Sequence, residues 1–186
     1  MLSILNAKEN GNKMDRRGFT LVELLVVLAV GSILLTIAIP GYAFLMNTNR
    51  LAAVTNDLVT ALHLARSEAV KRGIRVTVCK SDNPMAAAPA CSATAGWEQG
   101  WLVFVDDGTR GVIDPGDTLL WVRGQIAAGT IDPGSNFSHF VSYRPNGVSQ
   151  GSGNFPNGKL HICLEGNQRD IVINKTGRIR LESVSC

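Results

Sequence analysis

The chain has 186 residues, of which 45% are hydrophobic, and its 18 basic and 15 acidic side chains give a formal net charge of +3 at pH 7. This near balance excludes binding of nucleic acid through the overall charge of the protein, so any such site must be a local cluster. The length is sufficient for one membrane helix and one modest domain.

An apolar run near the N-terminus is the most distinctive segment of the chain. A basic pair and Gly18 come directly before it, and Glu23 is its one carboxylate. No charged residue follows Glu23 until Arg50, and residues 24–49 are long enough to cross a bilayer as a single helix. A lone carboxylate in such a segment is costly in lipid, which makes Glu23 a candidate functional residue.

The charges that precede the apolar run predict its orientation in a membrane. Residues 1–18 contain four basic and two acidic side chains, a net charge of +2. Because positive flanks stay in the cytoplasm, the chain beyond the run is expected on the opposite side of the membrane. A conventional secretory signal is disfavoured because the run continues past Ile39 without an A-x-A-like cleavage site.

Residues 16–28, which read RRGFTLVELLVVL, resemble the class III leader and N-terminus of type IV pilins and pseudopilins. The resemblance implies cleavage between Gly18 and Phe19 by a prepilin peptidase, N-methylation of Phe19, and assembly with other pilins from the bacterial inner membrane. It also implies that Glu23 pairs with a terminal amine during assembly, since a buried carboxylate is tolerated when a cation neutralises it.

The apolar run is followed by a second helical pattern. Pro40-Gly41 is expected to interrupt and bend the apolar helix. Residues 51–69 then place apolar side chains at three- and four-residue spacing with polar side chains between them, which predicts an amphipathic helix that lies on a sheet. Gly73 is a plausible end of this helix.

After Gly73 the helical period gives way to short β-rich runs separated by loops rich in Gly, Pro, Asn and Asp. The predicted strands are residues 74–80, 101–106, 118–123, 137–144, 159–164, 170–174 and 178–182. The expected fold class is therefore α+β and pilin-like, with a long N-terminal helix, first transmembrane and then amphipathic, packed on an antiparallel β-sheet head.

These elements predict three parts along the chain. Residues 1–18 are the cleaved leader and residues 19–49 the transmembrane and assembly helix. Residues 50–186 are a periplasmic head, made of the helix half 50–73 and the β-domain 74–186.

The four cysteines are an even set, as expected for disulfide bonds in an oxidising periplasm: Cys79, Cys91, Cys163 and Cys186. The sequence alone allows three pairings. We favour Cys79–Cys91 and Cys163–Cys186, because each closes a local loop. A zinc site would need closer spacing of its ligands than these cysteines have.

Three further segments resemble the GspH/FimT group of minor pilins and pseudopilins. Residues 62–72 match its ARSEAVKRG stretch, residues 100–106 read GWLVFVD, and residues 174–180 end in Gly-Arg-Ile-Arg. Some members of this group are minor pilins of type IV pili, and FimT-type members are implicated in DNA capture during natural transformation. Others are tip-forming minor pseudopilins of type II secretion systems.

The last of these segments is a candidate site for double-stranded DNA. Arg178 and Arg180 should point to the same face of an extended strand, Lys175 precedes the turn at Gly177, and Arg169 lies on the preceding strand. Such cations can contact successive phosphates. Alternatively, they are solvated residues that protect a sheet edge from aggregation. The FimT resemblance favours DNA uptake, and the secretion role remains the alternative.

Other motifs do not predict an enzyme. Residues 147–151 satisfy G-x-S-x-G, but their flanking residues predict a loop rather than the strand and helix of a nucleophile elbow. Residues 153–160 lack the Ser or Thr of a P-loop. The oxygen-rich segment 106–117 has the composition of a calcium loop without the alternation and terminal Glu of an EF-hand, and the same composition is typical of turns. We expect no catalytic residue, cofactor or metal.

Overall fold

The structure is a computed structural model, and it describes residues 18–153 and 155–186. The predicted leader therefore lies outside the described residues, apart from Gly18. The chain divides into two compact units, the first ending at Ala43 and the second running from Phe44 to Cys186. The two units are described separately below.

The first unit consists of the N-terminal part of helix α1 (Leu21–Arg72) and the residues before it. The Glu23 backbone N–H donates to the Thr20 hydroxyl oxygen over 3.2 Å, an N-terminal cap that satisfies one of the free amides of the first turn. This helix has a stretch long and apolar enough to cross a membrane, judged by length and composition. It continues through Pro40, where we expected an interruption; proline removes one backbone donor, and the bonds on either side maintain the helix.

The second unit begins with the remainder of α1, whose buried side chains recur every three or four residues: Leu51, Thr55, Leu58, Ala61, Leu62, Ala65 and Ala69. This is the predicted amphipathic stripe. Three of these residues are alanines at four-residue spacing, and their small side chains allow the helix to pack closely on the strands. Gly73 follows the helix at φ +70°, a conformation that glycine adopts without strain.

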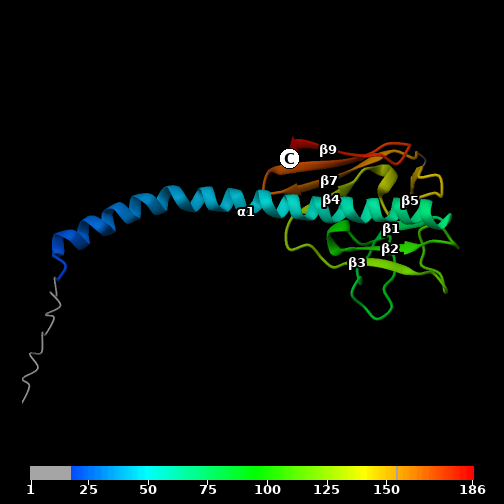
Figure 1. Ribbon diagram of the computed structural model, residues 1–186, viewed down its shortest axis with the longest axis horizontal. Coiled ribbons are helices and arrows are strands. Elements are labelled where there is room, and N and C mark those ends of the chain that lie inside the picture. The colour runs from blue at the N-terminus through cyan, green and yellow to red at the C-terminus, as the bar shows by residue number, and fades with distance from the viewer. Residues whose placement is uncertain (1–17, 154) are drawn as a thin grey trace, which may run out of the picture. The chain divides into compact units, whose positions relative to one another are not determined.

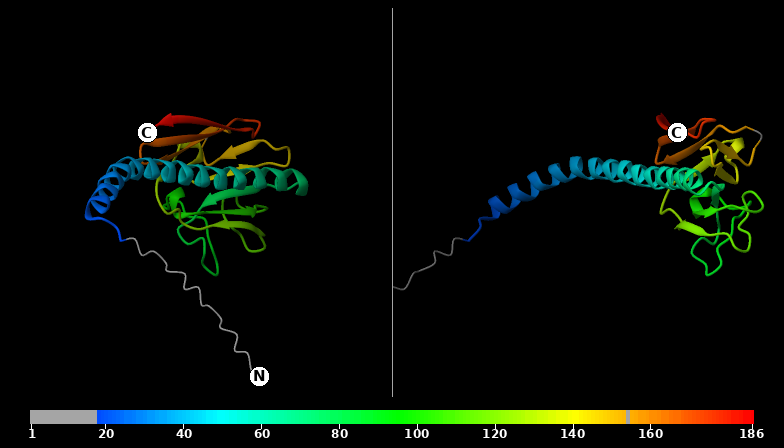
Figure 2. Two further views of the ribbon diagram at one scale, coloured as in Figure 1. Left: turned by 60° about the vertical axis from the view of Figure 1, so that its left-hand side comes forward. Right: turned by 45° about the vertical axis from the view of Figure 1, so that its right-hand side comes forward.

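Two antiparallel sheets pack with this part of α1. The first has the order β3 (Leu119–Arg123), β2 (Trp101–Val105), β1 (Val76–Lys80), β5 (Phe140–Tyr143) and β6 (Ser149–Gly151). The second has the order β4 (Thr130–Pro133), β7 (Gly158–Leu164), β8 (Asn167–Ile173) and β9 (Ile179–Ser185). Figures 1 and 2 show β1–β3 on one side of the helix and β7 and β9 on the other.

The core is shared by the helix and both sheets. Its largest side chains include Trp97 and Phe137, which belong to the two short 3₁₀ helices, Trp97–Gln99 and Ser135–Phe137. The indole N–H of Trp97 donates to the Phe137 backbone carbonyl over 3.1 Å, so that its buried polar atom is satisfied. A smaller cluster on the first sheet contains Cys79, Leu102 and Phe104, and β1 and β2 are buried along their whole length.

The structure extends and corrects the predicted strands. It adds β4, which ends in Asp132-Pro133, and β6, which reads Ser-Gln-Gly. The two become strands by pairing, β4 with β7 and β6 with β5. Residues 149–151 are thus a short strand rather than the loop we expected. Phe137 belongs to a 3₁₀ helix, while β8 begins earlier and β9 ends later than predicted.

Both disulfide bonds have the pairing favoured from the sequence. Cys79–Cys91 links β1 to the following loop with a Cα–Cα distance of 5.6 Å. Cys163–Cys186 links β7 to the last residue of the chain with a Cα–Cα distance of 6.1 Å. Because β8 lies between β7 and β9, the second bond fastens the end of the edge strand β9 to a strand further inside the sheet.

Candidate functional site

The turn between β8 and β9 positions the predicted DNA-binding residues. Its first residue, Asn174, accepts hydrogen bonds on its side-chain oxygen from the Arg178 backbone N–H and the Thr176 hydroxyl, both over 2.8 Å. The Gly177 N–H donates to the Asn174 carbonyl over 2.9 Å, and Gly177 has φ +77°. Asn at the start and Gly at the end are the residues that such a turn favours.

Neighbouring elements hold this turn in place. From α1, the Arg66 guanidinium donates to the Thr176 carbonyl over 3.0 Å and to the Gly147 carbonyl over 3.3 Å. A Cβ at position 177 would collide with the Gly147 carbonyl, so Gly177 is needed for the close approach of the two turns. The Ser149 hydroxyl lies 2.7 Å from the Asn174 carbonyl oxygen. The turn is therefore preorganised by the helix and by the β5–β6 hairpin.

This role of Arg66 was not predicted from the sequence. Arg66 lies in the ARSEAVKRG segment, where it was assigned only to the polar face of the helix. The long-range contact of Arg66 with a turn more than a hundred positions later could not be read from local spacing.

Four basic side chains line a groove of about 580 Å³ beside this turn, together with uncharged residues of β7, β8 and the turn. The basic residues are Lys159, Lys175, Arg178 and Arg180, and we call this the basic groove. Three of them are the predicted residues Lys175, Arg178 and Arg180. Lys159 is an addition: it pairs with Val172 of β8, which pairs with Arg180 of β9, so the three residues share one face of the sheet.

Arg169 is not part of the basic groove. It is a residue of β8 and lies two and four positions before the core residues Ile171 and Ile173, whereas Val172, between those two, lines the groove. Side chains alternate along a strand, so Arg169 points to the opposite face of the sheet. The expected participation of Arg169 in this cluster is therefore corrected.

Carboxylates neutralise part of the basic groove. Glu182 forms ion pairs with Lys159 over 2.9 Å and with Arg180 over 2.8 Å. The hydrogen bond between Lys159 and Glu182 raises the pKa of the Lys159 ammonium and lowers the pKa of the Glu182 carboxyl. Lys175 and Arg178 form no ion pair with another described residue. These two exposed cations are the groups most available to an anionic ligand.

A nearly buried carboxylate, Asp170, lies on the same face of the sheet as Lys159. Burial alone would raise the pKa of Asp170, but hydrogen bonds from Gln168 and His161 outweigh that effect and lower it. His161 Nδ1 is 2.8 Å from one Asp170 oxygen, and Lys159 Nζ is 3.5 Å from the other. Asp170 thus holds the side chains of Lys159, His161 and Gln168 in place beside the basic groove.

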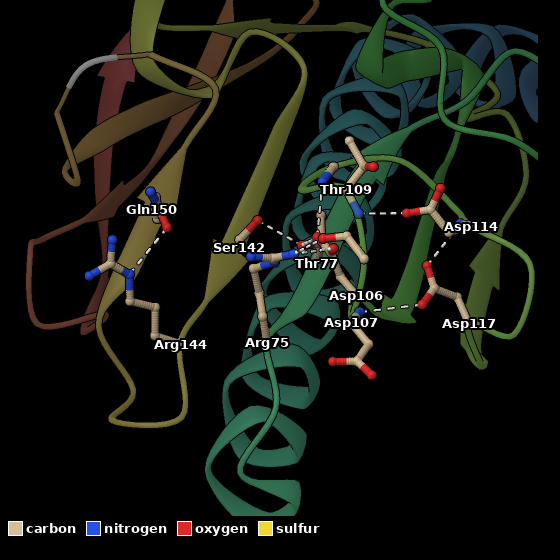
Figure 3. A network of polar contacts seen from close by, with 12 residues as sticks. Arg75, Thr77, Asp106, Asp107, Thr109, Asp114, Asp117, Ser142, Arg144 and Gln150 are labelled. Atoms are coloured by element: carbon tan, nitrogen blue, oxygen red, sulfur yellow. Dashed lines mark hydrogen bonds and ion pairs between the residues drawn. The ribbon is translucent and has the colours of Figure 1, made fainter.

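The acidic segment 106–117 uses its carboxylates to hold its own loop (Figure 3). Asp106 is 1% exposed and forms an ion pair with Arg75 over 2.8 Å, while the Thr77 hydroxyl and the Gly111 N–H also donate to it. Asp114 and Asp117 accept backbone N–H groups of the same loop. Within residues 18–153 and 155–186, no three His, Cys, Asp or Glu side chains gather as metal ligands would. The arrangement is that of a turn closed by side chains.

The predicted processing and assembly residues lie at the start of the first unit. Phe19 is 83% exposed, and Glu23 lies in the first turn of α1. Gly18 and Phe19 precede the helix and are exposed. The roles of Gly18, Phe19 and Glu23 remain predictions.

Comparisons with known proteins cover both units. The family model described as "Type II transport protein GspH" matches residues 54–177, and the model of the prokaryotic N-terminal methylation motif matches residues 13–39. The pilin-like protein PilA1 of Thermus thermophilus is 31% identical over 176 residues, which are 91% of this chain and 100% of that relative. The minor pilin FimU of Pseudomonas aeruginosa has a similar fold, with a TM-score of 0.52 and 20% identity over 74% of this chain and 92% of FimU.

Proposed function

Because the chain belongs to the GspH family of pilin-like proteins, we propose that it is a minor type IV pilin that binds double-stranded DNA through its basic groove. The coarser part of this statement, a minor type IV pilin or pseudopilin, follows from the family and the pilin-like fold. The DNA ligand and a role in DNA uptake are the proposal.

Processing and assembly form the first part of the proposal. A prepilin peptidase cleaves after Gly18, Phe19 becomes the methylated N-terminus, and the protein enters a fibre from the inner membrane with its second unit in the periplasm. The match to the N-terminal methylation motif supports this sequence of events. Glu23 neutralises a terminal amine in the apolar interior of the fibre, which favours subunits that enter in register.

The basic groove supports the choice of ligand. Its cations come from two strands and a preorganised turn, and no acidic side chain lines it. Arginine and lysine at such positions can contact successive phosphates without reading the bases, so binding should not depend on sequence. Only a few phosphates can be neutralised, and the affinity should fall with salt at a shallow slope of about −0.9 per phosphate contact.

A minor pseudopilin of a type II secretion system is the second candidate. The match to the family model described as a type II transport protein supports this role as well as it supports a minor type IV pilin. In that role the chain would associate with partner pseudopilins and would have no affinity for DNA. The basic residues would then be solvated edge residues of β9.

A gel-shift titration at two salt concentrations separates the two candidates. The full chain in uncharged detergent micelles is compared with Arg178→Ala/Arg180→Ala, and Arg50→Ala/Arg110→Ala serves as a control that removes the same charge from exposed positions outside the groove. DNA uptake predicts weaker binding and a shallower salt slope for the groove variant alone. No binding by the wild type at low salt, or equal losses in both variants, would favour the secretion role.

A further inference from the structure

A second hollow adjoins the basic groove. It has a volume of about 210 Å³, and its lining includes Arg144, Gln150, Phe155, Pro156 and Lys175. Lys175 also lines the basic groove, so the two hollows meet at this side chain. No acidic side chain lines either of them. We call the second one the Phe155 hollow.

Phe155 is unusual because its ring faces solvent. It is 66% exposed, and among the described residues beyond Leu45 it is the one exposed Phe, Tyr or Trp side chain. Exposure of a large apolar surface is unfavourable, and a ring that remains exposed on a folded unit is available to a ligand. The cations of the neighbouring groove indicate which ligand that is.

The backbone from Phe155 to Asn157 is anchored by hydrogen bonds. The Phe155 N–H donates to the Asn136 side-chain oxygen over 3.4 Å, and the Asn136 side-chain amide donates to the Asn157 carbonyl over 2.7 Å. Between them, the Pro156 carbonyl lies 2.6 Å from the Ser149 hydroxyl. The ring is thus presented by a tethered segment, which lowers the entropy that a ligand must remove on binding.

Arg144 stands on the other side of this hollow, at the end of β5. Its Nε donates to the Gln150 side-chain oxygen over 3.2 Å (Figure 3), and its two terminal nitrogens donate to no described residue. The guanidinium therefore has donors left for an anion. Arg144 and Lys175 provide two cations beside one exposed aromatic ring.

We propose that the Phe155 hollow is a stacking subsite for an unpaired base of single-stranded DNA. The base stacks on Phe155, its flanking phosphates contact Arg144 and Lys175, and the strand continues into the basic groove at Arg178. Every base has a π-face, so the subsite is tolerant of sequence. The bases of a duplex are paired and stacked within the helix, so they cannot reach the ring. This inference rests on the proposed DNA binding and adds a preference for single strands.

The test measures fluorescence anisotropy of three labelled probes with the full chain in uncharged detergent micelles. The probes are an oligothymidylate, a strand of the same length without bases, and a duplex of the same length. The variants are Phe155→Ala, Phe155→Trp, which retains an aromatic ring, and Met85→Ala, a control at another exposed apolar side chain on the Cys79–Cys91 loop.

Phe155→Ala should weaken oligothymidylate binding about fivefold or more, in the range found for base–aromatic stacking. Binding of the duplex and of the strand without bases should not change, and the salt slope should stay the same because Phe155 neutralises no phosphate. Phe155→Trp should bind oligothymidylate like the wild type, and so should Met85→Ala.

Other results would overturn the inference in distinguishable ways. If Phe155→Ala binds oligothymidylate like the wild type while Arg178→Ala/Arg180→Ala loses duplex binding, stacking is wrong and the proposed function stands. If Phe155→Ala weakens all three probes equally, Phe155 supports the groove structurally and is not a stacking residue. If the wild type binds none of the probes, the proposed function itself is wrong, and the inference falls with it.

Discussion

The basic turn after β8 and the acidic loop after β2 both contain several charged residues among turn formers, yet they use their charges in opposite ways. In the acidic loop, Asp106, Asp114 and Asp117 accept hydrogen bonds from the loop itself and from Arg75. In the basic turn, Asn174 and Gly177 form the turn, and the charged side chains of Lys175 and Arg178 are left exposed. The charged side chains of a loop are available to a ligand when other groups form the hydrogen bonds that the loop backbone needs.

The strongest test of this contrast is to remove the buried carboxylate of the acidic loop. Asp106→Ala leaves Arg75 without its ion-pair partner and the Gly111 N–H without its acceptor, and should lower the free energy of unfolding by about 3–5 kcal/mol. Urea denaturation followed by tryptophan fluorescence measures it. Asp107→Ala, an exposed neighbour, should change the stability little. Equal stability of both variants would contradict a structural role of the acidic loop.

Removal of the C-terminal disulfide bond tests whether DNA binding by the basic groove requires that the edge strand β9 be held in place at its end. Cys163→Ser/Cys186→Ser should lower the free energy of unfolding by about 2–4 kcal/mol and release the C-terminal end of β9, the strand whose first residues include Arg180. Denaturation and duplex titration of this variant should both show a loss. The matching Cys79→Ser/Cys91→Ser variant should lose stability without a specific loss of DNA affinity.

Arg66 tests whether the basic turn is preorganised. Arg66→Gln removes the hydrogen bonds to the Gly147 and Thr176 carbonyls and should destabilise the protein by about 2 kcal/mol. DNA affinity should fall while the salt slope is unchanged, because the phosphate contacts stay the same in number. The control Arg72→Gln, which removes an exposed ion pair to Glu68, should have little effect on either. A reduced salt slope for Arg66→Gln would mean that Arg66 itself contacts DNA.

The smallest expected effect comes from Glu182, the carboxylate that pairs with both Lys159 and Arg180 of the basic groove. Glu182→Gln should raise DNA affinity a few-fold at neutral pH, because Lys159 and Arg180 lose their shared partner. Glu165→Gln, on the turn before β8, is the matched control. Weaker DNA binding by Glu182→Gln would show that Glu182 positions the two cations.

The same carboxylate also predicts a pH dependence of stability. The pKa of Glu182 is lowered in the folded chain, chiefly by the hydrogen bond from Lys159, so the unfolded chain binds its proton more readily. Its contribution is therefore complete above the unfolded pKa and is lost as the pH falls through the folded pKa. Acid denaturation of the wild type should be steeper than that of Glu182→Gln. Identical acid profiles would exclude this contribution.

Much of the fold could be predicted from the sequence because its signals are local. The amphipathic stripe from Leu51 to Ala69 depends on spacing within one helix, and the longer strands depend on β-rich runs between turn residues. Strand β4 was missed because its pairing partner β7 lies further along the chain, and β6 was missed because its three residues, Ser-Gln-Gly, have no β-rich pattern. Within the candidate site, the expectation that Arg178 and Arg180 lie together was correct, although Arg178 belongs to the turn before β9. The face of the sheet to which Arg169 points was not known until β8 was placed.

By itself, the sequence determined the apolar helix, the methylation motif, the pilin-like family and the β-rich second half, since hydropathy, charge order and motif spacing are properties of neighbouring residues. Only the tertiary structure decided which cations share one groove, that Arg66 holds the turn from the helix, and that an exposed Phe155 adjoins the same groove. These juxtapositions depend on strand order and on contacts between segments far apart in the chain. The physical reason is that a binding surface is made by packing, and packing joins residues that no local pattern connects.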